Sequence, residues 1–195
     1  PWLDESHSSD FSLSNGTDQR ESVEIGATQA IGLLDNFPGL AEGFDVVIGN
    51  PPYSRIPPDG HQGVRAAHFA SAPGGASQTK WSLYPLFVEM LWRFGHPRLS
   101  SGGMVVPMSI AYSTETQIRR LRSAISQVPG DWRFAFFDRT PDSLFGDDVK
   151  TRNCIVLWRR DEATKVGRFW TGPFLRWNSR NRKDLFKQLP CVSLD

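Results

Sequence analysis

The sequence predicts an α/β fold with a mostly parallel sheet and helices on both of its faces. Three observations predict it: short apolar runs stop abruptly at proline, amphipathic segments of helical periodicity separate them, and the two kinds of segment alternate along the chain. A chain of 195 residues buries roughly 70% of the surface that it exposes when unfolded. It is therefore long enough for a substantial hydrophobic core.

The first strand is predicted over 44–49, where the run FDVVIG is apolar and β-branched. It stops at Asn50, Pro51 and Pro52, because proline cannot donate a hydrogen bond to a sheet ladder. A stretch rich in Pro, Gly, Ala and Ser then fills 57–79. Loops of this length either carry function, here by closing over a substrate, or are flexible insertions, and the sequence leaves both interpretations open.

A helix is predicted from residue 81 onward, with Ser82 as its N-cap and Pro85 in its first turn, ending at Gly95 and Pro97. A second helix follows Thr114 and Gln117, whose spacing resembles a capping box. Three further short strands are predicted at 104–106, 132–137 and 154–158.

Charge and cysteine content narrow the class of protein. The 22 Lys+Arg against 21 Asp+Glu give a net charge of +1, which argues against a strongly basic nucleic-acid coat. No apolar run reaches the length of about 18 residues that crosses a membrane, and no secretory leader opens the chain. Cys154 and Cys191 lack the spacing of a disulfide framework or a zinc site. We expect a cytoplasmic protein with no bound metal and no membrane contact.

The composition also predicts how the chain is divided. Residues 1–30 are polar and are expected to be poorly ordered or truncated. The alternating pattern occupies 31–160, and the Trp-rich stretch 161–195 is expected to begin another element or a target-recognition region. Because the chain begins with Pro1, we expect it to be part of a longer polypeptide.

The tetrapeptide Asn50-Pro51-Pro52-Tyr53 follows the first predicted strand directly. An exocyclic or amide nitrogen is a poor nucleophile because its lone pair is delocalised. The carbonyls of Asn50 and Pro51 can accept hydrogen bonds from such an amino group and free that lone pair. Proline fixes the backbone and stiffens these positions, and Tyr53 offers a flat face for stacking. A proline-rich strand exit is the alternative interpretation, but the preceding apolar strand favours catalysis.

The segment FDVVIGNPPY resembles the catalytic strand and loop of amino-group methyltransferases, most closely the TaqI-like DNA adenine-N6 methyltransferases of restriction-modification systems. Residues 80–89 look like the helix after that loop, and residues 102–107 look like the next strand. The segment from Leu144 to the strand at 154–158 looks like a later motif of the family. The resemblance covers 31–160 and implies a partial Rossmann-like methyltransferase fold.

The resemblance implies roles for single residues on the substrate side. Asn50 and the Pro51 carbonyl would hold the amino group of an adenine flipped out of duplex DNA, and Tyr53 would stack on that base. Phe145 would pack against the base from another side. A core or turn aromatic is the alternative for Phe145.

S-adenosylmethionine is the cofactor that the resemblance implies. Asn50, Pro107 and Asp35 would face it, although Asp35 is equally explained as a turn residue. The glycine-rich cofactor loop of the family lies upstream of the tetrapeptide, and nothing in this chain supplies it. We therefore expect the remainder of a longer polypeptide to carry the cofactor loop and the target-recognition domain, and this chain to be inactive alone.

Three other interpretations use the same residues. Glutamine-N5 protein methyltransferases and ribosomal RNA guanine methyltransferases also act on planar amino groups with this tetrapeptide. The long loop after Tyr53 and the helix at 80–89 favour DNA over both. A non-catalytic, truncated remnant is the third alternative, and the missing glycine loop favours it.

Overall fold

The computed structural model describes residues 39, 42–56, 68–72, 81–145, 151–181, 183–185 and 192–194. Contacts divide the chain into two compact units, Pro1–Ala41 and Glu42–Asp195. All elements below belong to the second unit, and the predictions for residues 1–30 and Asp35 lie outside the described residues. Within the described residues, no helix is both long enough and apolar enough to cross a membrane.

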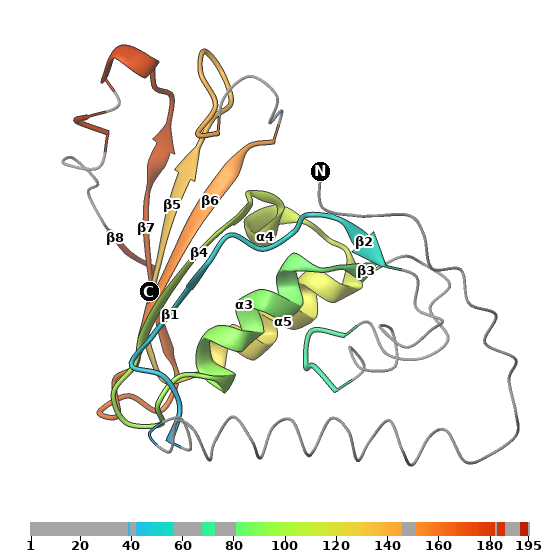
Figure 1. The fold of residues 1–195 in the computed structure, drawn as a ribbon, viewed down its shortest axis with the longest axis vertical. Coiled ribbons are helices and arrows are strands. Elements are labelled where there is room, and N and C mark those ends of the chain that lie inside the picture. Colours follow the sequence, from blue (N-terminus) through green and yellow to red (C-terminus); the bar gives the residue numbers. More distant parts are fainter. Residues whose placement is uncertain are drawn as a thin grey trace, which may run out of the picture. The chain divides into compact units, whose positions relative to one another are not determined.

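Six strands form one sheet in the order β1-β4-β6-β5-β7-β8. β1 is parallel to β4 and β5 is parallel to β7, whereas β6 is antiparallel to both of its neighbours and β8 is antiparallel to β7. Four of the six strands therefore run in one direction, which confirms the mostly parallel sheet (Figure 1). The strands are β1 Val46–Gly49, β4 Ser101–Pro107, β5 Gly130–Phe137, β6 Asn153–Arg159, β7 Gly167–Leu175 and β8 Val192–Leu194.

The four strands predicted from sequence are confirmed as β1, β4, β5 and β6. Their order in space differs from their order in the chain, because β6 lies between β4 and β5. β7 was not predicted, because Gly172 and Pro173 interrupt its apolar run and both residue types are unusual inside strands. The sheet accommodates them with a register shift between Phe134 and Phe136 on β5.

Helices α3, Tyr84–Arg93, and α5, Thr116–Ser126, lie side by side on one face of the sheet (Figure 1). Their apolar faces join a core that includes Leu91, Leu121 and the fully buried Trp132. Gly102 permits this close packing, since a Cβ there would stand 2.7 Å from Leu91 Cδ2 on α3. The short helix α4, Ser109–Tyr112, follows the carboxyl end of β4.

The opposite face of the sheet carries exposed apolar side chains in the described part of the chain. Val46 is 62% exposed, Ile48 78% and Leu157 49%. Val47, between the first two, packs into the core on the helix-covered face. Successive strand residues alternate between faces, so β1 presents one side chain to the core and its neighbours to solvent.

The helix caps predicted from sequence are wrong, while Pro85 does stand in the first turn of α3. The N-cap residues are Leu83 and Glu115, and neither makes a side-chain capping bond. Ser82 belongs instead to β3, Trp81–Ser82, which pairs with β2, Arg55–Ile56. Gln117 receives the Ser82 N–H and donates to the Ser82 carbonyl, both at 2.8 Å. These tertiary bonds replace the local capping bonds.

The long loop after β2 is held against α3 where the structure describes it, at residues 68–72. Glu89, fully buried, accepts the backbone N–H groups of Ala70 at 2.8 Å and Ser71 at 2.9 Å. Arg93 neutralises the Glu89 carboxylate at 2.8 Å. This part of the loop is therefore fixed by a buried charge. Residues 57–67 and 73–80 lie outside the described residues.

We expect Gln117→Ala to lower the free energy of unfolding by roughly 2 to 4 kcal/mol, because it leaves two buried backbone groups of Ser82 without partners. Thr114→Ala is the matched control and should change stability by less than about 0.5 kcal/mol. Urea denaturation of both variants checks this. If Thr114→Ala lowered the free energy of unfolding more than Gln117→Ala, the result would favour the capping box predicted from the sequence.

Candidate active site

The carboxyl ends of β1, β4, β5 and β7 lie at one edge of the sheet because these strands share a direction. A row of paired residues marks this edge: Pro107 on β4 faces Asn153 on β6, which faces Phe137 on β5, which faces Leu175 on β7. Asn50 follows β1 directly and belongs to the same edge. Ligands of α/β sheets bind at such an edge.

The predicted catalytic tetrapeptide leaves β1 at this edge with Pro51 buried and both Asn50 and Pro52 exposed. The Tyr53 hydroxyl lies 3.4 Å from Asn50 Oδ1, which is a long contact for an O–H···O bond. The Asn50 carbonyl oxygen therefore retains capacity to accept further hydrogen bonds. The buried proline beside it restricts the backbone that carries this side chain.

Tyr53 is held in place by two strands that are distant from it in the sequence. Its hydroxyl donates to the Val105 carbonyl at 3.1 Å and lies 3.4 Å from Asn153 Oδ1. Its ring packs against the core cluster under α3 and α5 while remaining half-buried. Tyr53 thus fixes the loop to β4 and β6, and its position is set by tertiary contacts as well as by the two prolines.

Asn153 is a site residue that sequence reasoning missed. It is 1% exposed and is the first residue of β6, opposite Pro107 and Phe137. Nothing in the local sequence marks it, because its contact with Tyr53 joins residues 100 positions apart.

Burial raises the pKa of Tyr53 from 10.0 to about 12, and the nearby Cys154 thiol adds to this effect. The phenol is therefore neutral throughout the physiological range and cannot serve as a general base. It remains a hydrogen-bond donor and a flat apolar surface. These properties fit a residue that positions a planar group.

The other residues predicted at the site have different outcomes. Phe145 is 44% exposed, and its neighbour Leu144 packs with Phe137, the last residue of β5. Pro107, the last residue of β4, is partly exposed at the edge. The stacking role of Phe145 and the cofactor role of Pro107 stay predictions, and Asp35 lies outside the described residues.

The described residues contain neither a reactive cysteine nor a metal site. Cys154 is free and buried, and burial raises the pKa of its thiol, so it stays protonated. In the described ranges, no three His, Cys, Asp or Glu side chains come together as a metal site. Cys191 lies outside those ranges.

Two arginines of α5 have structural roles. Arg120 donates to the Ala72 carbonyl at 2.6 Å. Arg122 donates to the carbonyls of Ile110 at 3.0 Å and Ser113 at 2.8 Å. These bonds tie the loop and α4 to α5.

A buried ion-pair group that sequence reasoning missed lies just beyond the row of paired residues at the carboxyl edge of the sheet. Asp138 follows β5, is 2% exposed, and pairs with Arg152 and Arg176, each at 3.0 Å. The hydrogen bond from Arg152 is the main cause that holds the pKa of Asp138 below its usual value, and the Arg139 N–H and Arg176 add to it. The carboxylate is therefore ionised at neutral pH.

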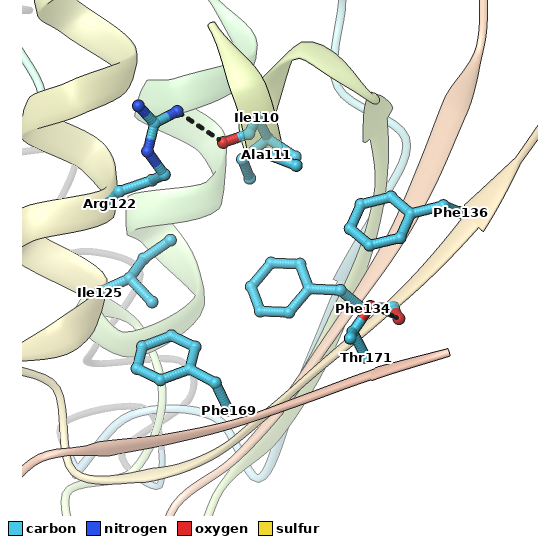
Figure 2. A pocket seen from close by; sticks show the side chains of 8 residues that line it. All are labelled: Ile110, Ala111, Arg122, Ile125, Phe134, Phe136, Phe169 and Thr171. Carbon is cyan, nitrogen blue, oxygen red and sulfur yellow. Dashed lines mark hydrogen bonds between the residues drawn. The ribbon is translucent and has the colours of Figure 1, made fainter. Parts of the chain in front are cut away.

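A cavity of about 500 Å³ lies outside the tetrapeptide, beside α5. Figure 2 shows Phe134, Phe136 and Phe169 facing it from the sheet, with Arg122 bonded to the Ile110 carbonyl at its rim. Its walls are apolar and it contains none of residues 50–53. The cavity is a feature of the core beside α5 and does not contribute to the chemistry of the candidate site.

The described residues do not form a complete site for S-adenosylmethionine. Such cofactors need a glycine-rich turn after a strand, so that backbone can approach them closely. No such turn follows the carboxyl end of β1, β4, β5 or β7 in the described chain. The residues present at this edge fit the amino-group side of a transfer reaction.

Sequence comparison gives one family. The pattern of the family described as Eco57I restriction-modification methylase matches residues 5–129. None of the curated proteins compared with the chain matches it significantly.

Structural comparison gives neighbours of low sequence identity and similar fold. A DrdV–DNA complex solved by cryoEM has a TM-score of 0.60 at 15% identity, covering 81% of this chain and 18% of that chain. A nuclease-deletion mutant of the Type ISP restriction-modification enzyme LlaGI, bound to a DNA substrate mimic, has a TM-score of 0.56 at 14% identity, covering 78% and 17%.

A protein described as a modification subunit of a type I restriction enzyme from Vibrio vulnificus YJ016 has a TM-score of 0.51 at 13% identity, covering 79% of this chain and 34% of that chain. The chain therefore spans about a third of one of these three structures and less than a fifth of the other two. The partial Rossmann-like methyltransferase fold expected from the sequence is confirmed.

We expect Tyr53 to ionise near pH 12, where a free tyrosine ionises near 10.0. A raised pKa in the folded state means that the stability linked to this phenol is complete below pH 10 and is lost as the pH rises from 10 to 12. The difference in ultraviolet absorbance between wild type and Tyr53→Phe during alkaline titration isolates this group. A difference midpoint near 10 in the folded protein would show that Tyr53 is solvated.

Proposed function

The chain belongs to the Eco57I restriction-modification methylase family, and on that premise we propose that it forms the substrate-binding part of a catalytic domain that methylates adenine N6 in DNA. The cofactor is S-adenosylmethionine, and the partners are DNA and the remainder of a longer, cytoplasmic polypeptide. The alternatives are transfer to a glutamine amide and a non-catalytic remnant.

The observation that carries this proposal is the anchoring of Tyr53 beside an uncommitted Asn50 carbonyl at the ligand-binding edge of the sheet. The Tyr53 hydroxyl donates to the Val105 carbonyl at 3.1 Å, while Asn50 is exposed and, among the described residues, its side chain makes only a 3.4 Å contact. An anchored ring next to a free acceptor suits a planar group that carries an amino function. Adenine has this form when it is extruded from the duplex.

The residues of this chain act by binding and orienting the base. Asn50 Oδ1 and the Pro51 carbonyl accept the two hydrogens of the amino group, so that its lone pair is less delocalised into the ring. The ring of Tyr53 stacks on the base and offsets part of the cost of unstacking, a few kcal/mol. Phe145 packs against the base from another side. Because the Tyr53 phenol is neutral, it takes no proton from the substrate.

S-adenosylmethionine supplies a methyl group activated on a sulfonium when it is bound. The described residues hold no glycine-rich turn for it, so we assign that turn to chain beyond them. DNA as substrate is supported by the two neighbours of similar fold that are DNA complexes. The span of 18% of the DrdV chain supports a larger parent protein that also carries target recognition.

We expect Asn50→Ala to lower kcat for DNA methylation by roughly 10² to 10³, the usual cost of removing one preorganised hydrogen-bond group from a transition state. Tyr53→Phe keeps the stacking ring but loses the hydroxyl bond to the Val105 carbonyl, so its activity should lie between those of the wild type and Tyr53→Ala. The assay uses labelled S-adenosylmethionine, the full-length protein that contains this chain, and mixed-sequence duplex DNA digested to nucleosides. Gln127→Ala, an exposed amide at the end of α5, is the control and should retain full activity.

Other outcomes decide between the alternatives. Label in a glutamine-containing protein fraction instead of N6-methyladenine would assign the chain to the protein methyltransferases. Absence of label from both, together with no cofactor binding by calorimetry, would identify a remnant.

A further inference from the structure

Two arginines converge on one buried carboxylate at the ligand-binding edge of the sheet. Arg152 immediately precedes β6, Arg176 immediately follows β7, and Asp138 immediately follows β5. The Asp138 side chain is 2% exposed, whereas Arg152 is 49% exposed and Arg176 75%. The carboxylate therefore lies beneath the surface and the two guanidinium groups reach solvent.

Each guanidinium uses only its inner nitrogen to reach Asp138. Arg152 donates from Nε to Oδ1 and Arg176 from Nε to Oδ2, both at 3.0 Å. In the part of the chain that the structure describes, no hydrogen bond engages the terminal nitrogens of either arginine. Two planar forks with free terminal donors suit the oxygens of a phosphate.

The charge of this group is unbalanced. Two guanidinium groups surround one carboxylate, so the ion pairs among these three residues leave a net charge of +1. The neighbouring Asp142 accepts the Ser179 N–H at 2.5 Å and has no ion pair with Arg152 or Arg176 among the described residues. One phosphate diester would neutralise the group.

A similar group at the opposite edge is balanced and provides a comparison. Asp131, near the start of β5, is 6% exposed and pairs with Arg159 at 3.1 Å and Arg168 at 2.6 Å. Arg168 also pairs with Asp161 at 2.7 Å, so two carboxylates meet two arginines. β5 thus has a buried aspartate near each end, and only the one at the ligand-binding edge leaves excess positive charge.

The unbalanced group adjoins the residues that hold the base-stacking tyrosine. Arg152 is next in sequence to Asn153, whose Oδ1 lies 3.4 Å from the Tyr53 hydroxyl. Neighbouring strands are about 4.8 Å apart, so β7 and Arg176 lie two strands, roughly 10 Å, from β6. This is the scale of a few nucleotides of one DNA strand, whose charges are about 3.4 Å apart along the helix axis.

We propose that Arg152 and Arg176, oriented by Asp138, bind a backbone phosphate of the DNA strand that carries the target adenine. This inference rests on the proposed function, because it takes DNA as the substrate. It adds a phosphate contact that fixes the strand while the base is out of the stack. Phosphate contacts of this kind position the protein and carry no sequence information.

The test measures DNA affinity as a function of salt with the full-length protein that contains this chain. The probe is a fluorescent duplex holding one adenine opposite an abasic site, which lowers the cost of extrusion. Arg152→Gln and Arg176→Gln should each weaken binding roughly tenfold and reduce the slope of log K against log salt by about 1. Arg159→Gln removes an equivalent ion pair at the opposite edge and should leave both quantities unchanged.

A second measurement guards against variants that fail to fold. Neutral methylphosphonates in place of the phosphates flanking the adenine should weaken binding by the wild type and by Arg159→Gln, and should have a much smaller effect on Arg176→Gln. An equal effect of the neutral linkages on all three proteins would overturn the proposal. An equal loss of affinity in Arg159→Gln and Arg176→Gln, or no DNA binding by the wild type, would also overturn it.

Methylation of the DNA is measured in a separate assay. The experiment can therefore reject the proposed methylation activity and the proposed phosphate site independently of each other. Selective loss of DNA affinity in Arg152→Gln and Arg176→Gln, in a protein that transfers no methyl group to DNA, would keep the phosphate site and reject the proposed enzyme activity. If the protein methylates DNA but neither substitution changes the DNA affinity or its dependence on salt, the proposed activity stands and the phosphate site is rejected.

Discussion

β6 pairs along its whole length with β4 on one side and with β5 on the other, and this double ladder is the constraint on which the site depends. It aligns Asn153 with the last residues of both neighbours, Pro107 and Phe137. From that position Asn153 meets the Tyr53 hydroxyl, and Arg152, one residue earlier, meets Asp138. A slip of one residue would turn every side chain of β6 to the other face and separate both contacts.

Buried polar groups hold the irregular parts of the chain around this sheet. Glu89 receives two backbone N–H groups of the loop at 68–72, Gln117 pairs with the backbone of Ser82, and Asp138 receives two arginines and a backbone N–H. Each is satisfied by groups from another element. A polar group buried without its partner costs about 1 to 3 kcal/mol, so such bonds favour one loop conformation over its alternatives.

The site combines a fixed, partly buried tyrosine with side chains that are accessible to solvent. The Tyr53 hydroxyl is bonded to the Val105 carbonyl of β4 and its pKa is raised to about 12, while Asn50 and the side chains of Arg152 and Arg176 are exposed. Such an arrangement loses little conformational freedom when a planar base and a phosphate bind. The proposed tasks of holding and orienting a substrate therefore fall to residues of this chain. The glycine-rich turn that would hold the methyl donor is not among the described residues.

The sequence by itself determined the elements whose signals are local. Four apolar runs predicted β1, β4, β5 and β6, because apolar residues and strand-ending prolines act through neighbouring residues alone. The tetrapeptide after β1 predicted Asn50 and Tyr53 as site residues, and their catalytic roles stay a proposal. Local patterns failed where distant partners competed for the same atoms. Ser82 and Gln117 have the residue types of helix caps, but they bond to each other across 35 positions.

Only the tertiary structure decided the position of β6 between β4 and β5, the inclusion of β7, and the contacts of Asn153 and Asp138. These contacts join residues up to 100 positions apart, and strand register sets them, which no window of neighbouring residues encodes. The chemistry proposed for the tetrapeptide thus follows from the sequence, whereas the surface that surrounds it depends on how the sheet is assembled.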